Sequence, residues 1–530
     1  MHTEQQRIVI AVSPASALAA RPRLFAALEA AFPVSFVAPA DGEPPAGAAA
    51  LIALAQDGRL AAREDLARRG LPVLALHGDG DEDAGAEAFE LLNTPGVDAR
   101  LRAVVLSGRL TGAGLDPDGD EVLAVADSGP AWTASAGPAP VHRVRAALGE
   151  LGPDEPLYAV LSSRALAAVA LIHFLRAVAA PAGWRPPPLR ATMHFDDPNL
   201  RWRSYGFINY GELLEHADAH GYHVAMATIP LDAGRPNRAA AALFRERPDR
   251  LSLVFHGNDH IKGELMAPKD VAGATAVAAQ ALRRVERFER RAALRVDRVM
   301  TPPHGMCSEH MTRALGALGF DALAAIYPRP WTDRFPSDPP LAGWHPADWV
   351  GGCAVIPRIP LSSSVADIAL RAFLDHPVVL YAHHEDVAGG LEPLAAAAAA
   401  VNRLGDVQWM SMGDIAASNG DRRLAGECAV VRPYARRLRL AAEPGARTLR
   451  VQAPADALDG GSLEGWSVGD GPLQPFGTDV PWQGNGHVEI RLRGAQDLDA
   501  SDVAAPAWRP WPKLRRAATE ARDRLMPLRS

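Results

Sequence analysis

The chain has 530 residues, which is too many for one ordinary domain and predicts two to four. With 48% hydrophobic and 22% charged residues, its composition is that of a folded globular protein and not of a disordered one. A net charge of -7 gives no overall attraction to nucleic acid, and three cysteines without a CxxC spacing favour neither a disulfide framework nor a cysteine zinc site.

Residues 1–180 alternate short apolar runs, such as RIVIAV, VSFVAPA, ALIALA and LPVLAL, with helical patterns. This alternation predicts a flavodoxin-like α/β domain with a parallel sheet. No cysteine precedes Cys307, which excludes an amidotransferase-type nucleophile from this domain. Because it also lacks the glycine-rich nucleotide-binding motifs, we expect the domain to be non-catalytic.

The most apolar stretch, Ala159 to Ala180, is interrupted by Arg164, His173 and Arg176, so we predict a buried helix and no transmembrane segment. The N-terminal residues lack a basic region followed by an apolar run, which is the pattern of a signal peptide. We therefore expect a cytoplasmic protein.

Residues 189–419 contain a second series of strands and helices. The predicted strands are ATMHFDD, HVAMATIPL, LSLVFHG, RVMTPPHG, DALAAIY, PVVLYAHH and VQWMSM. Roughly seven strand–helix units in succession predict an irregular (β/α) barrel, in which the loops at the carboxyl ends of the strands carry the chemistry.

Residues 420–507 change to alternating patterns such as TLRVQAP and HVEIRLR, which predict a small antiparallel β domain. Residues 508–530 form a basic helical tail. Its functional interpretation is peripheral contact with a membrane surface or a partner, and the alternative is a solvated terminal helix.

Polar residues gather where the apolar strands of the central region end. The clusters are Asp196 with Asp197, His256 with His260, His304 in a Pro-Pro-His-Gly turn, and His383 with His384 and Glu385. A histidine pair at this spacing is a weak signal, because His216 and His220 repeat it within an amphipathic helical pattern. His256 differs because it closes an apolar strand.

Two histidines and one carboxylate can hold a divalent ion and leave a fourth position for water, which is the arrangement of a catalytic zinc site. Asp197 is a candidate for the carboxylate ligand. Read alone, the pair Asp196–Asp197 favours a structural cap or turn, and the polar residues at the other strand ends reverse this balance in favour of the functional interpretation.

From about Thr192 to His383 the chain resembles the polysaccharide deacetylase (NodB-homology, carbohydrate esterase family 4) domain. That family has TFDD, HxxxH, RxPxG and LxxH motifs in this order. Here the order is HFDD (194–197), HGNDH (256–260), TPPHG (301–305) and LYAH (380–383), and HPADW (345–349) occupies the region of the family's Asp/Trp motif.

The resemblance implies that Asp197, His256 and His260 bind one divalent ion, most often zinc. It also implies that Asp196 is the general base that activates a metal-bound water. His383 would then be the general acid that protonates the leaving amine.

The chain departs from the family pattern at three positions. Thr301 replaces the arginine that orients the catalytic aspartate, and Arg298 is the nearby residue that could take its place. Pro198 and Gly257 replace the usual residues after FDD and after the first histidine.

Three residues are predicted to contact substrate. His304 lies in the turn, and Arg201 and Trp202 follow the carboxylates; packed loops are the alternative for all three.

The sequence therefore predicts a metal-dependent hydrolase that removes an N-acyl group, in particular acetyl, from a saccharide or a saccharide-bearing metabolite. Two alternatives are a catalytically inactive scaffold with the same barrel, which Thr301 favours, and a metal-dependent hydrolase of a non-sugar amide.

Overall fold

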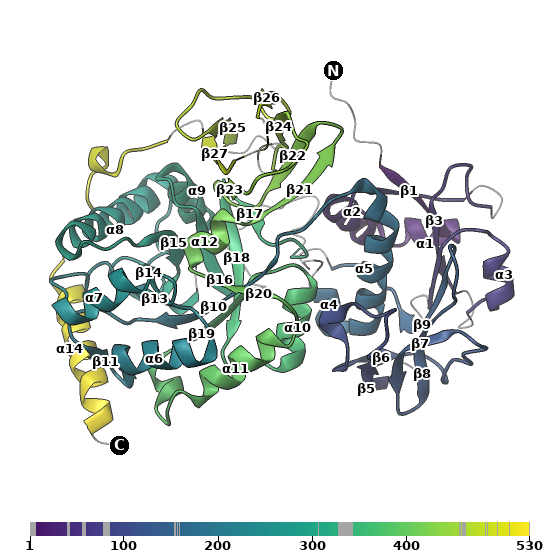
Figure 1. Cartoon of the computed structure of the whole chain (residues 1–530), viewed down its shortest axis with the longest axis horizontal. Coiled ribbons are helices and arrows are strands. Elements are labelled where there is room, and N and C mark those ends of the chain that lie inside the picture. Colours follow the sequence, from purple (N-terminus) through teal and green to yellow (C-terminus); the bar gives the residue numbers. More distant parts are fainter. Residues whose placement is uncertain are drawn as a thin grey trace. The chain divides into compact units, whose positions relative to one another are not determined.

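The computed structural model (Figure 1) describes residues 7–39, 43–55, 60–77, 85–152, 155, 157, 159–305, 307–326, 343–454, 457, 463–482, 484, 486–494, 497–507 and 509–528. The chain divides into two units. Unit 1 comprises Met1–Trp184, Pro336–His345 and Val365–Phe373, and unit 2 comprises Arg185–Phe335, Pro346–Ser364 and Leu374–Ser530.

Unit 1 is built on one sheet of nine strands in the order β2-β1-β3-β4-β9-β8-β7-β5-β6. The first five strands are parallel to one another, and the last four extend the sheet with antiparallel pairs. The parallel order is that of a flavodoxin-like sheet. The strands are β1 (Ile8–Ser13), β2 (Val34–Val37), β3 (Ala50–Leu54), β4 (Val73–His77), β5 (Gly85–Leu91), β6 (Val104–Leu110), β7 (Glu121–Ala126), β8 (Gly129–Ala134) and β9 (Val141–Ala147).

The burial of these strands follows their position. In β1, Ile10, Ala11 and Val12 are fully buried, as expected for a parallel strand covered on both faces. In β6, buried and exposed residues alternate along the whole strand, because only one face of the antiparallel part meets the core. The helices of unit 1 are α1 (Ala15–Ala19), α2 (Pro22–Ala31), α3 (Arg63–Ala67), α4 (Ala159–Ser163), α5 (Ala165–Ala179) and α10 (Val365–Phe373).

Helix α5 is the apolar helix that the sequence predicts to be buried. Ten of its 15 residues are buried, and it packs against β6 and β9. Among the residues that the structure describes, the window Ala165–Ala182 is the one helical segment long and apolar enough to cross a membrane, with 56% of it buried.

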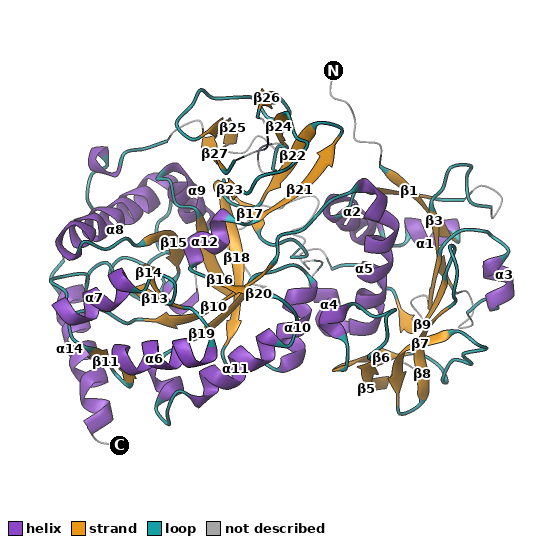
Figure 2. Ribbon diagram, in the orientation of Figure 1, coloured by secondary structure: helices purple, strands orange, loops and turns teal. Residues whose placement is uncertain are grey.

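Unit 2 contains a closed barrel of seven parallel strands, surrounded by helices (Figure 2). The strands are β10 (Leu189–Asp196), β13 (Val224–Thr228), β14 (Leu251–His256), β15 (Asp297–Thr301), β16 (Ala322–Ile326), β18 (Cys353–Pro360) and β19 (Val378–Ala382). The helices are α6 (Tyr210–His220), α7 (Arg238–Glu246), α8 (Val271–Ala292), α9 (Glu309–Ala317), α11 (Glu392–Asn402) and α12 (Met412–Ala417).

The barrel is irregular where it closes on β10. The first part of β10 pairs with β20 (Val407–Trp409), and its second part pairs with β13 and completes the ring. A short strand, β17 (Asp348–Val350), runs antiparallel to β18, and β11 (Ser204–Tyr205) and β12 (Ile208–Asn209) form a hairpin after β10. All eight residues of β10 are buried; the strand ends in Asp196, and Asp197 follows it at the carboxyl-terminal mouth of the ring.

Strand β18 is a barrel strand that the predicted series lacked. Its sequence, CAVIPRIP, contains Pro357 and Pro360, and proline within a run argues against a central strand. The predicted series instead counted VQWMSM, whose strand β20 pairs with β10 outside the closed ring. The omission matters because β18 carries Arg358, whose guanidinium contacts Asp196.

Two small sheets follow the barrel. One has the order β21-β22-β24-β26 and the other β23-β27-β25, and β22 pairs with β24 in parallel, so the region is not purely antiparallel as predicted. Buried side chains such as Val431 and Trp466 continue through Ile415 of α12 into the barrel core. The strands are β21 (Gly420–Ala425), β22 (Cys428–Pro433), β23 (Arg437–Leu440), β24 (Thr448–Val451), β25 (Leu463–Val468), β26 (Asp479–Pro481) and β27 (Val488–Gly494).

The C-terminal segment forms helix α14 (Trp511–Leu525), which lies beside β11 (Figure 1) and is joined to it by the hydrogen bond from the hydroxyl of Tyr205 to Asp523. It is not the freely solvated helix that was the alternative prediction, because Arg516, Glu520 and Asp523 are buried against unit 2.

Candidate metal centre and catalytic site

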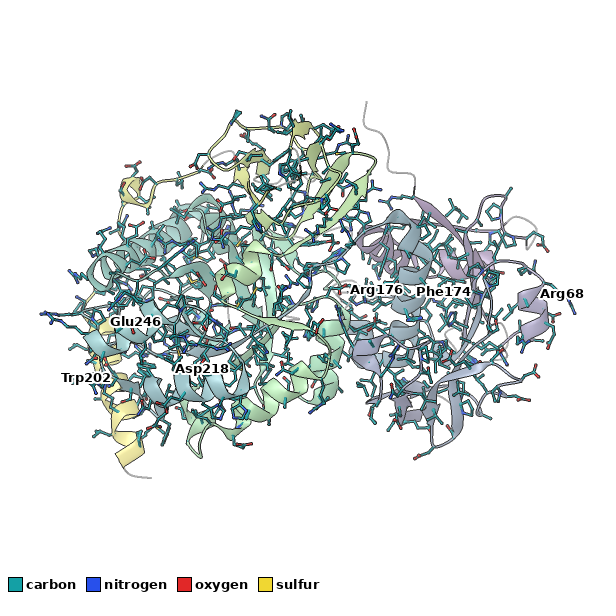
Figure 3. The ribbon with its side chains drawn as sticks, in the orientation of Figure 1. Arg68, Phe174, Arg176, Trp202, Asp218 and Glu246 are labelled. Atoms are coloured by element: carbon teal, nitrogen blue, oxygen red, sulfur yellow. The ribbon has the colours of Figure 1, made fainter. Side chains whose placement is uncertain are left out.

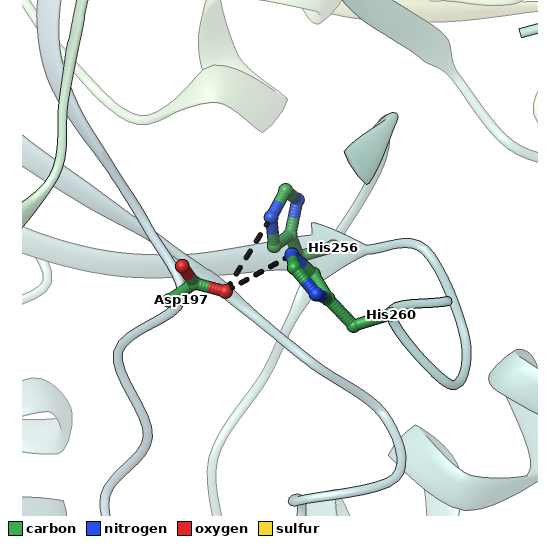
Figure 4. A group of neighbouring side chains, drawn as sticks. All are labelled: Asp197, His256 and His260. Atoms are coloured by element: carbon green, nitrogen blue, oxygen red, sulfur yellow. Dashed lines mark ion pairs between the residues drawn. The ribbon is translucent and has the colours of Figure 1, made fainter. Parts of the chain in front are cut away.

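The three predicted metal ligands meet at the mouth of the barrel (Figure 4). Asp197 follows β10, His256 ends β14, and His260 lies in the loop after β14. One ligand atom from each lies within 4.8 Å of the others. The Nε2 atoms of His260 and His256 are 3.1 and 3.8 Å from Oδ1 of Asp197.

The donor set fits a divalent ion. Oδ1 of Asp197 is buried and has no hydrogen-bond partner, although two imidazoles point at it. Nδ1 of His256 donates to the carbonyl of Thr301 at 3.2 Å, which leaves the lone pair of Nε2 facing the cluster. Burial lowers the pKa of both histidines to about 3, so both are neutral ligands at physiological pH.

The backbone at this site is held in sparsely populated conformations. Asp197 has φ 82°, and His260 and His304 each have φ 56°. These are three of the seven non-glycine residues with positive φ in the described part of the chain. Such conformations persist where the surrounding structure imposes them, and they concentrate at functional sites.

The loop that carries His260 is organised by a buried carboxylate. Glu264 accepts the backbone N–H groups of Asn258, Asp259 and His260 at 2.8 to 2.9 Å, and burial raises its pKa to about 7. Gly257 has φ +60°, and a Cβ there would lie 2.1 Å from Oε1 of Glu264. The glycine in place of the family's Ser or Thr therefore accommodates the buried glutamate.

The second carboxylate, Asp196, is held as an anion. Burial acts to raise its pKa, but the guanidinium of Arg358, then His256 and His194, outweigh it, and the pKa lies well below its usual range. Nη1 of Arg358 donates to both carboxylate oxygens at 2.8 and 2.9 Å. His194 contacts Oδ1 at 3.3 Å through Nε2. Asp196 is thus fixed in orientation and ionised.

Arg358 is the arginine that contacts Asp196, a position for which the sequence analysis considered Arg298. Arg298 instead pairs with Glu289 at 2.8 Å, at the start of β15 and away from the mouth. Arg358 is 2% exposed, and its guanidinium also lies 4.6 Å from the ring centre of Tyr381. Thr301, which replaces the family arginine, contacts His194 at 3.1 Å through its hydroxyl.

A second arginine that the sequence did not single out reaches the centre from the C-terminal helix. Nε of Arg516 donates to Asp232 at 2.9 Å, and its Nη1 lies 3.8 Å from Oδ1 of Asp197. The arginine is 2% exposed. No local pattern marks it, because its partners lie hundreds of residues earlier in the chain.

The predicted general acid, His383, follows β19 and has an exposed side chain. Phe195 of β10 pairs with Ala382 of β19, so His383 follows β19 at the level where Asp196 ends β10. The neighbouring His384 is buried and faces Asp523 of α14, with 3.8 Å between Nε2 and the carboxylate.

The predicted substrate contacts divide into two groups. His304 is exposed beside the centre, with its ring 5.2 Å from that of His260. Arg201 and Trp202 instead contact α14: Arg201 donates to Glu520 at 2.8 Å, and Arg524 lies 5.4 Å from the ring centre of Trp202. Trp202 projects at the edge of unit 2 (Figure 3).

No protein-family model and no curated protein matches the chain. Solved structures that resemble it are carbohydrate deacetylases and esterases. Agd3, described as a carbohydrate deacetylase, aligns over 92% of this chain and 98% of its own, with 10% identity and a TM-score of 0.47.

Two further structures align with a smaller part of the chain. A mutant of BA3943, a CE4 family pseudoenzyme with restored activity, covers 44% of this chain and 69% of its own, at 12% identity and a TM-score of 0.27. A family 4 carbohydrate esterase from Streptomyces lividans aligns over 41% of this chain and 86% of its own, at 13% identity and a TM-score of 0.23. At these values the likeness carries no argument about activity, which depends on the side chains of the site.

Proposed function

We propose that the chain is a divalent-metal-dependent hydrolase that removes an N-acyl group, in particular acetyl, from a saccharide or a saccharide-bearing metabolite. The observation that carries the proposal is the convergence of Asp197, His256 and His260 beside Asp196, which is separately buried and held as an anion. The saccharide follows from the resemblance of the four motifs.

Asp197, His256 and His260 would hold the ion, with zinc the expected metal because two imidazoles and one carboxylate are its usual catalytic ligands. When bound, the ion supplies Lewis acidity: it lowers the pKa of a water molecule and polarises an acyl carbonyl. The neutral state of the two histidines favours this role, since a protonated imidazole cannot be a ligand.

Asp196 would accept the proton of the attacking water. Its low pKa makes it a weak base on its own, so it needs a water already acidified at the centre. Arg358 keeps the carboxylate ionised and fixes its direction. His383, exposed after the neighbouring parallel strand β19, would then protonate the leaving amine.

Thr301 was the reason to consider an inactive scaffold, because the family's arginine is missing there. Arg358 provides a guanidinium on the same carboxylate from another strand, which supports a catalytic centre over an inactive scaffold. A non-sugar amide would use the same centre, and substrate profiling distinguishes it from a saccharide.

The first experiment is elemental analysis of protein purified without a histidine tag. We expect about one zinc or other divalent ion per chain, lost in His256→Ala. The matched control is His220→Ala. His216 and His220 have the same spacing, and their rings lie 4.3 Å apart on α6, but no carboxylate joins them to form a described metal cluster.

The second experiment measures acetate release from N-acetylated oligosaccharides. Asp196→Asn should keep the metal and lose about 100-fold or more of the rate, since general base catalysis contributes on the order of 10² to 10⁴. A wild-type protein that stays metal-free after incubation with zinc, cobalt and nickel would refute the proposal.

A further inference from the structure

Helix α14 has a polar face turned towards the barrel. Arg516, Glu520 and Asp523 follow helical spacing, and all three are buried. Each is paired across the interface: Arg516 with Asp232 at 2.9 Å, Glu520 with Arg201 at 2.8 Å, and Asp523 with the hydroxyl of Tyr205 at 2.8 Å. The helix is therefore attached to unit 2 by ions and hydrogen bonds, whereas most surface helices attach through an apolar stripe.

The apolar stripe of α14 faces the solvent. Trp511, Leu514, Ala518, Ala521 and Leu525 are spaced by three and four residues and thus lie along one side of the helix. All five are exposed, and the three large side chains are 67%, 62% and 49% exposed in chain order. We call these five residues the outer stripe.

Other exposed hydrophobic side chains lie in loops that α14 contacts. Twelve large hydrophobic side chains are exposed in the described part of the chain, and three of them are in the outer stripe. Two more, Trp202 and Ile261, lie in loops next to residues that α14 contacts: Arg201 pairs with Glu520, and Arg515 donates to the carbonyl of His260. Isolated exposed hydrophobics are ordinary, but this concentration indicates an interaction surface.

The exposed charged side chains of α14 itself are cationic, although Arg522 also pairs with the buried Asp523 at 2.6 Å. Lys513 and Arg522 are exposed, and Arg515 is partly exposed. The only acidic residues within Trp511–Leu525, all of which the structure describes, are Glu520 and Asp523, and both are buried on the other side. The outward surface of α14 is cationic, although the whole chain has a net charge of -7.

We propose that the outer stripe of α14 docks onto an anionic lipid surface. A helix with exposed Trp and Leu on one side and flanking Lys and Arg is the pattern that lies in a membrane interface, with its apolar side chains between the headgroups. A second copy of the chain fits less well, because facing helices would bring Lys513, Arg515 and Arg522 against their own counterparts.

The polar face keeps α14 attached to the barrel while the outer stripe meets lipid. Arg516 lies 3.8 Å from Asp197, so the metal centre is on the inner side of this helix. Docking would place the centre within about 10 Å of the headgroups, roughly the diameter of one helix. The surface is defined without reference to catalysis, so the proposal stands independently of the proposed hydrolase.

The experiment is co-sedimentation of the full chain with vesicles of phosphatidylglycerol and phosphatidylcholine, compared with phosphatidylcholine alone. The test variant is Trp511→Gln/Leu514→Gln, whose target side chains are mostly exposed. The matched control is Leu473→Gln, which replaces a side chain that is 51% exposed in the loop between β25 and β26. Circular dichroism and thermal unfolding confirm that each variant is folded.

We expect binding to the anionic vesicles that is weakened about tenfold or more in the double variant and unchanged in Leu473→Gln. Lys513→Glu should weaken it further, and added salt should weaken it in all proteins. The proposal is overturned if the chain ignores anionic vesicles, binds neutral vesicles equally well, or binds through a surface that the double variant leaves intact. A concentration-dependent dimer that Leu514→Gln abolishes would also overturn it, since the occupant would be a second copy.

Discussion

Replacement of Arg358 by Met is the sharpest test of the catalytic carboxylate. The side chains of Arg358 and Asp196 are 1% and 5% exposed, so the substitution leaves a buried charge without its partner. Breaking such a pair from one side costs about 3 to 5 kcal/mol of unfolding free energy. Met fills most of the volume, which keeps the cavity contribution small.

The pH dependence of the stability loss shows whether it comes from the ion pair between Arg358 and Asp196. The folded pKa of Asp196 is depressed, so the pair stabilises the protein above the unfolded pKa of about 3.9 and loses this effect as pH falls through the folded value. In Arg358→Met, burial is no longer outweighed by the guanidinium, and the pKa moves upward. The stability difference between wild type and variant should therefore be full near pH 7 and shrink in acid.

The assay is denaturant unfolding of the metal-free proteins, with Arg298→Met as the matched control. Arg298 and Glu289 are 28% and 16% exposed, and a partly solvated pair contributes about 1 kcal/mol or less. Acetate release should fall by about 100-fold in Arg358→Met, because the base loses its orientation. Equal stability of the two variants, or full activity of Arg358→Met, would refute the role assigned to Arg358.

Three further results are expected. Gly257→Ser should weaken zinc binding by about tenfold or more and lower the free energy of unfolding by about 1 to 3 kcal/mol, because the serine Cβ would collide with Glu264. Calorimetric titration with zinc measures the affinity, and an unchanged affinity would contradict this prediction. Zinc at about 100 times its Kd should stabilise the wild type by about 2.7 kcal/mol but leave His260→Ala unaffected in thermal unfolding. Burial lowers the pKa of His142 to about 4, and its ring accepts a hydrogen bond from Trp132 at 3.2 Å. Stability should thus decline by about 3 kcal/mol as pH falls from 6.5 to 4, and His142→Gln should remove that part of the decline in an acid titration followed by fluorescence.

The sequence alone predicted which residues of the central site lie close together. Asp197 and His256 each follow an apolar run, and the carboxyl ends of parallel strands meet at one side of a barrel, so local patterns predicted their proximity. The same reasoning separated His256 and His260 from the helical pair His216 and His220. The buried helix α5 was likewise predictable, because its long apolar stretch is interrupted by polar residues that argue against a membrane span.

The residues that complete the site depended on the tertiary structure. Arg358 lies 162 positions after its partner, on a strand whose prolines conceal it in the sequence. Arg516 reaches Asp197 only because the chain returns to the barrel as α14. Nothing local specifies either pairing: barrel closure and the docking of a terminal helix are set by packing over the whole unit, and buried charges find their partners only once that packing exists.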